Sequence, residues 1–171
     1  PPPPPPRLSA VAPHRVLHPA HRRQRQLWIS DRCSACVAGK FANETGSSFC
    51  WECPSGSFSG NGSVVRSNCT CNRGFTGPDG GPCRACDAGM FKPQSGSAPC
   101  QACAAGSYHS MLAQWDRGAC SACEAGKFAN ETGSSFCWNC PSASFSGNGS
   151  VVRSNCTCNQ GFFGPDGGPC R

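Results

Sequence analysis

Residues 33–58 read CSACVAGKFANETGSSFCWECPSGSF, and this stretch decides the fold. It holds two C-x-x-C pairs whose corresponding cysteines stand 17 residues apart. The second cysteine of each pair, Cys36 or Cys53, opens the same short phrase, C-x-x-G-x-Phe. Cysteine, glycine and an aromatic side chain at fixed intervals indicate a scaffold built from cross-links and tight turns.

The phrase recurs along the chain and assigns a role to each of its residues. It begins at Cys36, Cys53, Cys86, Cys103, Cys123 and Cys140. We expect the glycine to take positive φ in a tight turn after the half-cystine, as glycine does at no steric cost. The aromatic residue should begin a short strand and cover the neighbouring disulfide. In the last occurrence Ala143 stands in the glycine place.

A second, longer repeat is a near-verbatim duplication. The segment 33–84 returns as 120–171, with 47 of 52 positions identical. The differences are Val37/Glu124, Glu52/Asn139, Gly56/Ala143, Arg73/Gln160 and Thr76/Phe163. Duplication of a cysteine-dense unit predicts tandem modules, each in contact with its neighbours only. We expect a tail over 1–32, modules over 33–84 and 120–171, and a linking module over 85–119.

Composition supports a disulfide scaffold. The chain has 171 residues, of which 17 are cysteine, 21 glycine and 16 proline. Its large apolar residues are too sparse to offset a backbone entropy of about 1–2 kcal/mol per residue. A bridge that closes a loop of about 17 residues stabilises by roughly 3 kcal/mol. The predicted fold class is therefore small and disulfide-rich, with tandem cysteine-rich modules of short β-hairpins and loops in an elongated array.

Two chemistries compete for the cysteines, because C-x-x-C pairs also bind zinc. Sequons for N-glycosylation favour disulfides, since they matter only in the secretory compartment, which is oxidising. They lie at Asn43, Asn61, Asn68, Asn130, Asn148 and Asn155. The predicted half-cystines are Cys33, Cys36, Cys50, Cys53, Cys69, Cys71, Cys83, Cys86, Cys100, Cys103, Cys120, Cys123, Cys137, Cys140, Cys156 and Cys158. An intracellular zinc-binding array is the alternative.

The pairing of these cysteines does not follow from their spacing. One arrangement bridges successive pairs as rungs of a ladder, Cys33–Cys50 and Cys36–Cys53, and we take it as the working prediction. Cys170 is left over, because the residue that would match Cys86 as its partner falls beyond Arg171. The odd cysteine count then reflects a truncated second copy.

The first 32 residues differ in character from the modules. Pro1–Pro6 should form a polyproline II segment, followed by a His/Arg-rich stretch that we expect to be disordered. The tail carries a net charge of +5 and the rest of the chain only +1, which argues against a nucleic-acid partner for the modules. No apolar run is long enough to span a membrane, and no signal peptide is visible. We expect an extracellular or cell-surface location, with any signal or anchor outside this sequence.

The phrases resemble the cysteine-rich repeats named tyrosine-protein-kinase ephrin type A/B receptor-like, and more distantly the modules of tumour-necrosis-factor receptors. The residues that carry the resemblance are Cys36–Phe41, Cys50–Phe58, Cys83–Phe91, Cys100–Tyr108 and Cys120–Phe145. The element Cys69–Cys83, which returns as Cys156–Cys170, is similar to the C-terminal hairpin of epidermal-growth-factor-like domains. The resemblance implies an extracellular, non-catalytic role as spacer, adhesion or ligand-binding segment. It implies no kinase, because the chain has no His-Arg-Asp segment.

Candidate catalytic groups are few. His109 stands between Ser107 and Ser110, but an exposed loop histidine is the favoured interpretation over a nucleophile–base pair. We predict no enzyme activity, cofactor or metal, and a protein or glycan ligand that the sequence does not identify. Trp51 and Trp138, inside C-x-x-C pairs, either pack on a disulfide or serve as exposed anchors for a partner. Phe163 should lie at the surface, because the other copy has threonine there.

Overall fold

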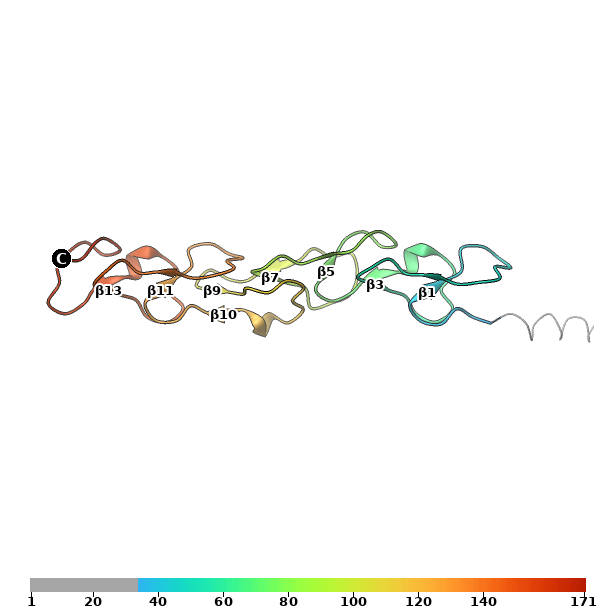
Figure 1. Ribbon diagram of the computed structural model, residues 1–171, viewed down its shortest axis with the longest axis horizontal. Coiled ribbons are helices and arrows are strands. Elements are labelled where there is room, and N and C mark those ends of the chain that lie inside the picture. Colours follow the sequence, from blue (N-terminus) through green and yellow to red (C-terminus); the bar gives the residue numbers. More distant parts are fainter. Residues whose placement is uncertain (1–33) are drawn as a thin grey trace, which may run out of the picture. The chain divides into compact units, whose positions relative to one another are not determined.

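The computed structural model describes residues 34–171, of which Ala35–Arg171 form one compact unit. This unit contains seven two-stranded antiparallel hairpins, which follow one another in chain order (Figure 1). The strands are β1 Lys40–Phe41, β2 Trp51–Glu52, β3 Ser57–Phe58, β4 Thr70–Cys71, β5 Phe75–Thr76, β6 Arg84–Ala85, β7 Met90–Phe91, β8 Gln101–Ala102, β9 Ser107–Tyr108, β10 Ser121–Ala122, β11 Lys127–Phe128, β12 Trp138–Asn139, β13 Ser144–Phe145 and β14 Thr157–Cys158. Three short 3-10 helices, η1 Arg66–Asn68, η2 Arg117–Ala119 and η3 Arg153–Asn155, complete the regular structure. The predicted small disulfide-rich fold of tandem hairpins is confirmed.

Six of the seven hairpins grow directly from the repeated phrase, and β5–β6 grows from a shortened form of it. The first strand of each hairpin carries the aromatic residue, and in most hairpins the second strand is the dipeptide between the cysteines of the following pair. In the first hairpin, Phe41 of β1 lies opposite Trp51 of β2. The amide of Cys53 then donates to the carbonyl of Gly39 at 2.9 Å. A two-residue strand has few ladder bonds of its own, so the flanking turn and disulfide hold it in place.

The phrase glycines occupy the turns as predicted. Five of them have φ between 74° and 83°: Gly39, Gly56, Gly89, Gly106 and Gly126. A hydrogen bond from Lys40 N to Val37 O, 3.1 Å long, closes the first of these turns. Such a turn needs positive φ at its third residue, which glycine adopts freely. Ala143 keeps the same conformation with φ of 60°, although it carries a side chain.

The Gly56/Ala143 difference yields a matched pair of stability predictions. Ala143→Gly should stabilise the second copy by about 1 kcal/mol, because it relieves a left-handed alanine. Gly56→Ala should destabilise the first copy by more, because its Cβ would lie 2.7 Å from Cδ1 of Phe75. In the second copy, which carries Ala143 in place of Gly56, the ring equivalent to Phe75 belongs to Phe162 and is 45% exposed. Thermal unfolding of the two variants tests both signs, and equal effects of opposite sign would contradict the steric part.

Eight disulfides link the hairpins. They join Cys36–Cys50, Cys53–Cys69, Cys71–Cys83, Cys86–Cys100, Cys103–Cys120, Cys123–Cys137, Cys140–Cys156 and Cys158–Cys170. Each bridge thus joins a cysteine to the next one along the chain, with sequence separations of 12 to 17. Fifteen of the sixteen predicted half-cystines take part in these bridges, and Cys33 lies outside the described residues.

The ladder pairing was wrong. Cys50 bonds Cys36 rather than Cys33, and Cys53 bonds Cys69 rather than Cys36. The reason is the strand between the paired cysteines. Residues three apart in extended backbone point to opposite faces, so Cys50 points back to the loop it closes and Cys53 points on to the next. The two cysteines of one pair therefore bridge in opposite directions along the chain.

The prediction that Cys170 is left over was also wrong, because Cys170 bonds Cys158. Its counterpart in the first copy, Cys83, likewise bonds back to Cys71 and not forward to Cys86. The first cysteine of each pair therefore closes the loop that precedes it.

Backbone hydrogen bonds and buried sulfur hold neighbouring hairpins together. The turn amide of Gly39 donates to Ser59 O at 2.8 Å, and the ring of Phe58 covers the same turn. Gly74 N donates to Lys92 O at 3.0 Å and so crosses from the predicted first module into the linking module. Most of the buried core is half-cystine, supplemented by the three phenylalanines Phe41, Phe91 and Phe128. The disulfides therefore supply most of what a hydrophobic core supplies elsewhere.

Candidate functional site

A tilted pair of aromatic rings stands at the same place in both copies. In the second copy the centroids of Phe136 and Trp138 are 4.6 Å apart, with an interplanar angle of 67°. In the first copy Phe49 and Trp51 are 4.7 Å apart at 57°. Strand alternation produces the pair, because residues two apart share a face while the cysteine between them points to its disulfide. The alternation is therefore enough to fix both rings beside a cross-link.

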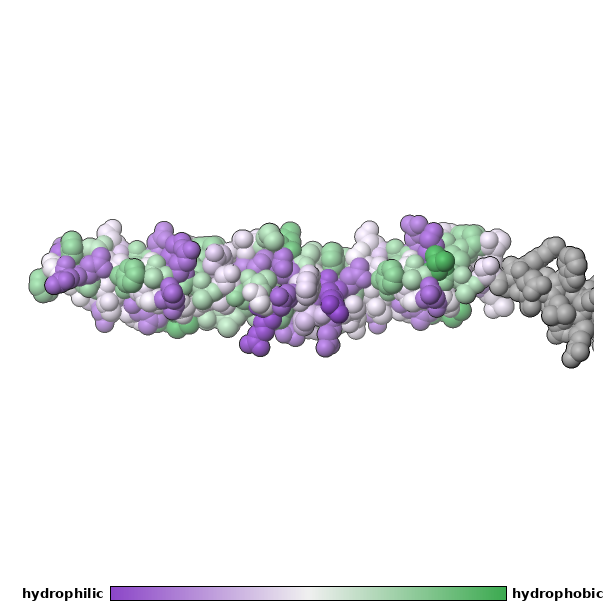
Figure 2. Space-filling model, turned by 90° about the horizontal axis from the view of Figure 1, so that it is seen from below, coloured by the Kyte–Doolittle hydropathy of each residue, from purple (hydrophilic) through white to green (hydrophobic). Residues whose placement is uncertain are grey.

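These four rings are exposed although they are large and apolar. Phe136 is 50% exposed and Trp138 is 55% exposed. Each tryptophan packs on its phenylalanine and remains open to solvent on its other side. Hydrophobic and hydrophilic side chains are interspersed over the face of Ala35–Arg171 seen in Figure 2. Both copies therefore present the same half-exposed ring pair at their surface.

In the second copy the ring pair lines an open hollow of about 800 Å³. We call it the aromatic hollow and define it by Phe128, Asn130, Phe136, Trp138, Pro141 and Arg153. Its lining combines ring faces, a sequon asparagine and a cation, so it offers both apolar contact and hydrogen bonds. The first copy carries the same residue types at the equivalent positions Phe41, Asn43, Phe49, Trp51, Pro54 and Arg66.

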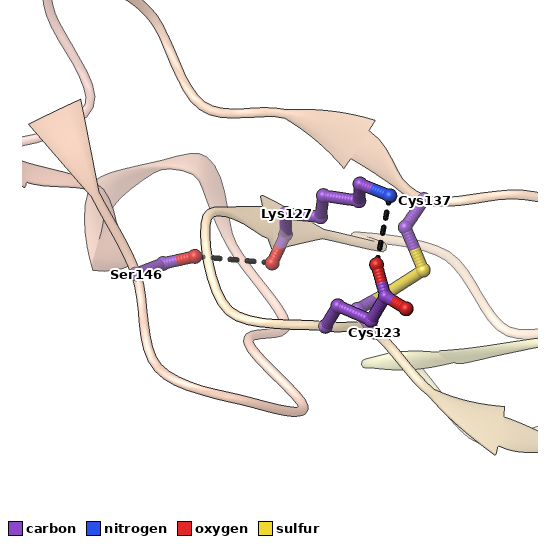
Figure 3. Close-up of polar contacts among 5 residues, drawn as sticks. Cys123, Lys127, Cys137 and Ser146 are labelled. Atoms are coloured by element: carbon purple, nitrogen blue, oxygen red, sulfur yellow. Dashed lines mark hydrogen bonds and ion pairs between the residues drawn. A yellow bond between two sulfur atoms is a disulfide. The ribbon is translucent and has the colours of Figure 1, made fainter. Parts of the chain in front are cut away.

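Lys127, beside the aromatic hollow, and its counterpart Lys40 each form one ion pair, but with glutamates at different positions. Figure 3 shows Lys127 above the Cys123–Cys137 bridge, with Ser146 Oγ donating to the Lys127 carbonyl at 3.0 Å. Lys127 Nζ lies 3.1 Å from a carboxylate oxygen of Glu124 across the turn. Its counterpart Lys40 instead reaches Glu52 on the opposite strand, at 3.3 Å. The Val37/Glu124 and Glu52/Asn139 differences together therefore move a carboxylate from one side of this lysine to the other.

All six sequon asparagines are exposed, but their side chains are not equivalent. The Asn61 amide oxygen accepts from Ala38 N at 2.7 Å. Asn68 and Asn155 accept from the backbone at the starts of η1 and η3, at Val65 N and Val152 N. Within residues 34–171, no such bond ties the side chains of Asn43, Asn130 and Asn148. These three asparagines have the freest amide groups of the set.

The other residues singled out from the sequence lie apart from the ring pairs. His109 Nδ1 is 3.1 Å from Met111 N, while the Ser107 hydroxyl donates to Ala104 O. The structure thus shows no serine–histidine hydrogen bond in this part of the described chain. Phe163 is 82% exposed, which confirms its predicted surface position.

Lys92 is a buried cation that sequence reasoning missed. Its side chain is 2% exposed, and Nζ donates to Phe75 O at 2.6 Å and to Gly96 O. Ser59 holds the equivalent place in the first hairpins, where its hydroxyl donates to Lys40 O. Burial lowers the pKa of Lys92, and the nearby Asp79 carboxylate partly opposes this. The lysine fastens the first module to the linking segment by donating to carbonyls on both.

The lowered pKa of Lys92 predicts a specific pH dependence of stability. Between its folded value and the ordinary 10.5, the unfolded chain binds more protons than the folded chain. The free energy of unfolding should therefore rise with pH through that window. Lys92→Met removes this contribution. The free energy of unfolding of the wild type, relative to that of the variant, should therefore increase as pH rises toward 10.5. Melting curves that run parallel at all pH values would contradict the prediction.

Residues 34–171 show neither a metal-binding cluster nor a membrane-spanning helix. Residues 34–171 contain no cluster of three or more histidine, cysteine, aspartate or glutamate side chains able to hold a metal ion. No helix in the described part of the chain has the length and apolarity needed to cross a bilayer. The dense disulfide bonding indicates an oxidising, extracellular environment.

Comparisons with known proteins do not assign the chain to a family: no family model matches it, and no curated protein does.

Proposed function

We propose that residues 33–171 are a non-catalytic extracellular segment of a cell-surface or matrix protein, and that they act as a spacer. The observation that carries this proposal is the unbroken series of bridges, each joining successive cysteines. Neighbouring hairpins are further tied by backbone hydrogen bonds such as Gly126 N to Ser146 O at 2.8 Å. Each hairpin is held by the hairpins next to it, so the fold of the chain is maintained without a globular core. The resemblance to ephrin-receptor-like repeats supports the same role.

The proposal is tested by intact mass of the full chain, alkylated before and after reduction. Sixteen of the 17 cysteines are bonded to one another, so at most one should react before reduction and all 17 afterwards. A zinc-binding array would instead react throughout after chelation and release metal. That outcome would overturn the extracellular assignment, because zinc ligands are free thiolates.

A second candidate function, ligand binding, rests on the linking segment. Met111, Leu112 and Trp115 are 60%, 61% and 54% exposed within five residues. The equivalent loops of the duplicated segments bridge Phe41 and Phe128 as this loop bridges Phe91, but their exposed apolar residues are valines only. Exposed aromatic and apolar residues mark interaction surfaces. Attachment of cells to the immobilised chain should fall with Trp115→Ala if the segment is adhesive. If cells attach equally to the wild type and to the variant, the adhesive role is refuted and only the spacer role remains.

A further inference from the structure

We propose that an N-linked glycan on Asn130 folds back onto the Phe136–Trp138 pair, so that the aromatic hollow holds the chain's own carbohydrate. The duplicated residues Asn43, Phe49 and Trp51 do the same in the first copy. This inference rests on the extracellular location proposed above, because the modification occurs only in the secretory pathway.

Strand register brings the sequon to the rings. In the hairpin β11–β12, Phe128 lies opposite Trp138 and Lys127 lies opposite Asn139. The same register continued by two residues places Asn130 opposite Phe136. Both residues line the aromatic hollow, which is consistent with that placement. The first sugar attached to Asn130 would therefore lie beside the rings, and no flexible segment between sugar and rings would have to be ordered.

The ring pair offers the surface that a pyranose requires. One face of a pyranose carries several C–H groups of slight positive charge, and an aromatic ring has a negative face. Two rings inclined at 67° form a corner that covers one sugar from two sides. Arg153, whose Nε already donates to Gly167 O, has further guanidinium N–H groups for the sugar hydroxyls, and Asn139, which also lines the aromatic hollow, adds an amide. The half-exposed rings would then lose contact with water.

The other sequons lack this arrangement. Asn148 is exposed but does not line the aromatic hollow, and the Asn155 amide oxygen holds the start of η3. The proposal therefore distinguishes sequons within one chain and provides its own controls.

The attachment step follows ordinary glycosyl transfer. Oligosaccharide reaches Asn130 from a lipid-pyrophosphate donor, whose anomeric C1–O bond breaks as a C1–Nδ2 bond forms. Nδ2 loses one proton, and the lipid pyrophosphate leaves with the electron pair of the broken bond. No oxidant or reductant takes part.

The test uses the full chain secreted from eukaryotic cells and mapped for glycan at each sequon. Nuclear Overhauser contacts should join sugar protons to the Trp138 ring. Enzymatic trimming of the glycans should lower the melting temperature by about 2–4 °C in the wild type. The loss should vanish in Asn43→Gln/Asn130→Gln and in Trp51→Ala/Trp138→Ala, and persist in the control Asn61→Gln/Asn148→Gln.

Failure of this inference can be told apart from failure of the proposed spacer function. Occupied Asn130 with no sugar–ring contact, or disulfide-bonded secreted protein with no glycan at Asn43 and Asn130, overturns this inference and leaves the spacer proposal standing. Freely alkylated cysteines in the secreted protein would overturn both.

Discussion

Gly89→Ala is expected to destabilise the described unit by about 3 kcal/mol or more. Gly89 has φ of 82°, and a Cβ there would lie 2.0 Å from the carbonyl oxygen of Gly133. The left-handed conformation costs an alanine about 1–2 kcal/mol, and forcing two backbones apart adds about 1–3 kcal/mol. Gly89 therefore marks a crossing of two chain segments that admits no side chain.

Two other glycines serve as matched controls. Gly46 has φ of 78° with nothing within 4 Å of an added Cβ, so Gly46→Ala should cost only about 1 kcal/mol. Gly60 has neither positive φ nor a close neighbour, so Gly60→Ala should stay within about 0.5 kcal/mol of the wild type. Denaturant unfolding ranks the three variants. If Gly89→Ala costs no more than Gly46→Ala, the close crossing is absent.

Removing one bridge should have an effect of similar size. Cys36→Ser/Cys50→Ser opens a loop of sequence separation 14, which corresponds to about 3 kcal/mol of chain entropy. The loss should be local, because each hairpin contacts mainly its neighbours. Amide hydrogen exchange should show lost protection over residues 36–52 and preserved protection in the second copy. The variant Cys123→Ser/Cys137→Ser, with the same separation, should give the mirror result.

Single substitutions test the pairing itself. Cys36→Ser should leave the thiol of Cys50 free for alkylation, whereas ladder pairing would free Cys53. Peptide mapping of the labelled cysteine decides between them, and a label on Cys53 would refute the observed connectivity.

Local features of the fold followed from the sequence because each depends on a few adjacent residues. Glycine after a half-cystine predicted the positive-φ turns, and the following aromatic predicted the strands. Gly74 was missed because its phrase, Cys71-Asn-Arg-Gly74-Phe75, is one residue shorter than the others. The pairing was not predictable from equal 17-residue intervals, since these leave open which face of the strand each cysteine occupies.

The candidate site was only partly predictable. Trp51 and Trp138 were singled out as packing on a disulfide or as exposed anchors, but their rings were not tied to Phe49 and Phe136 or to the sequons. That link depends on strand register, which two-residue strands do not reveal in sequence. The charge exchange around Lys40 and Lys127 was equally hidden. Positions 37 and 52 look like unrelated differences until the hairpin brings both beside one lysine.

The head-to-tail order of the bridges has a mechanical consequence. Under tension between Cys36 and Cys170, force passes through sulfur at every loop, because each bridge shortcuts the residues that it encloses. The residues enclosed by a disulfide cannot extend under force unless that covalent bond breaks. Only the short stretches between successive bridges can lengthen. We therefore expect the oxidised segment to behave as a nearly inextensible tether, and reducing agent to release most of its contour length in eight discrete steps.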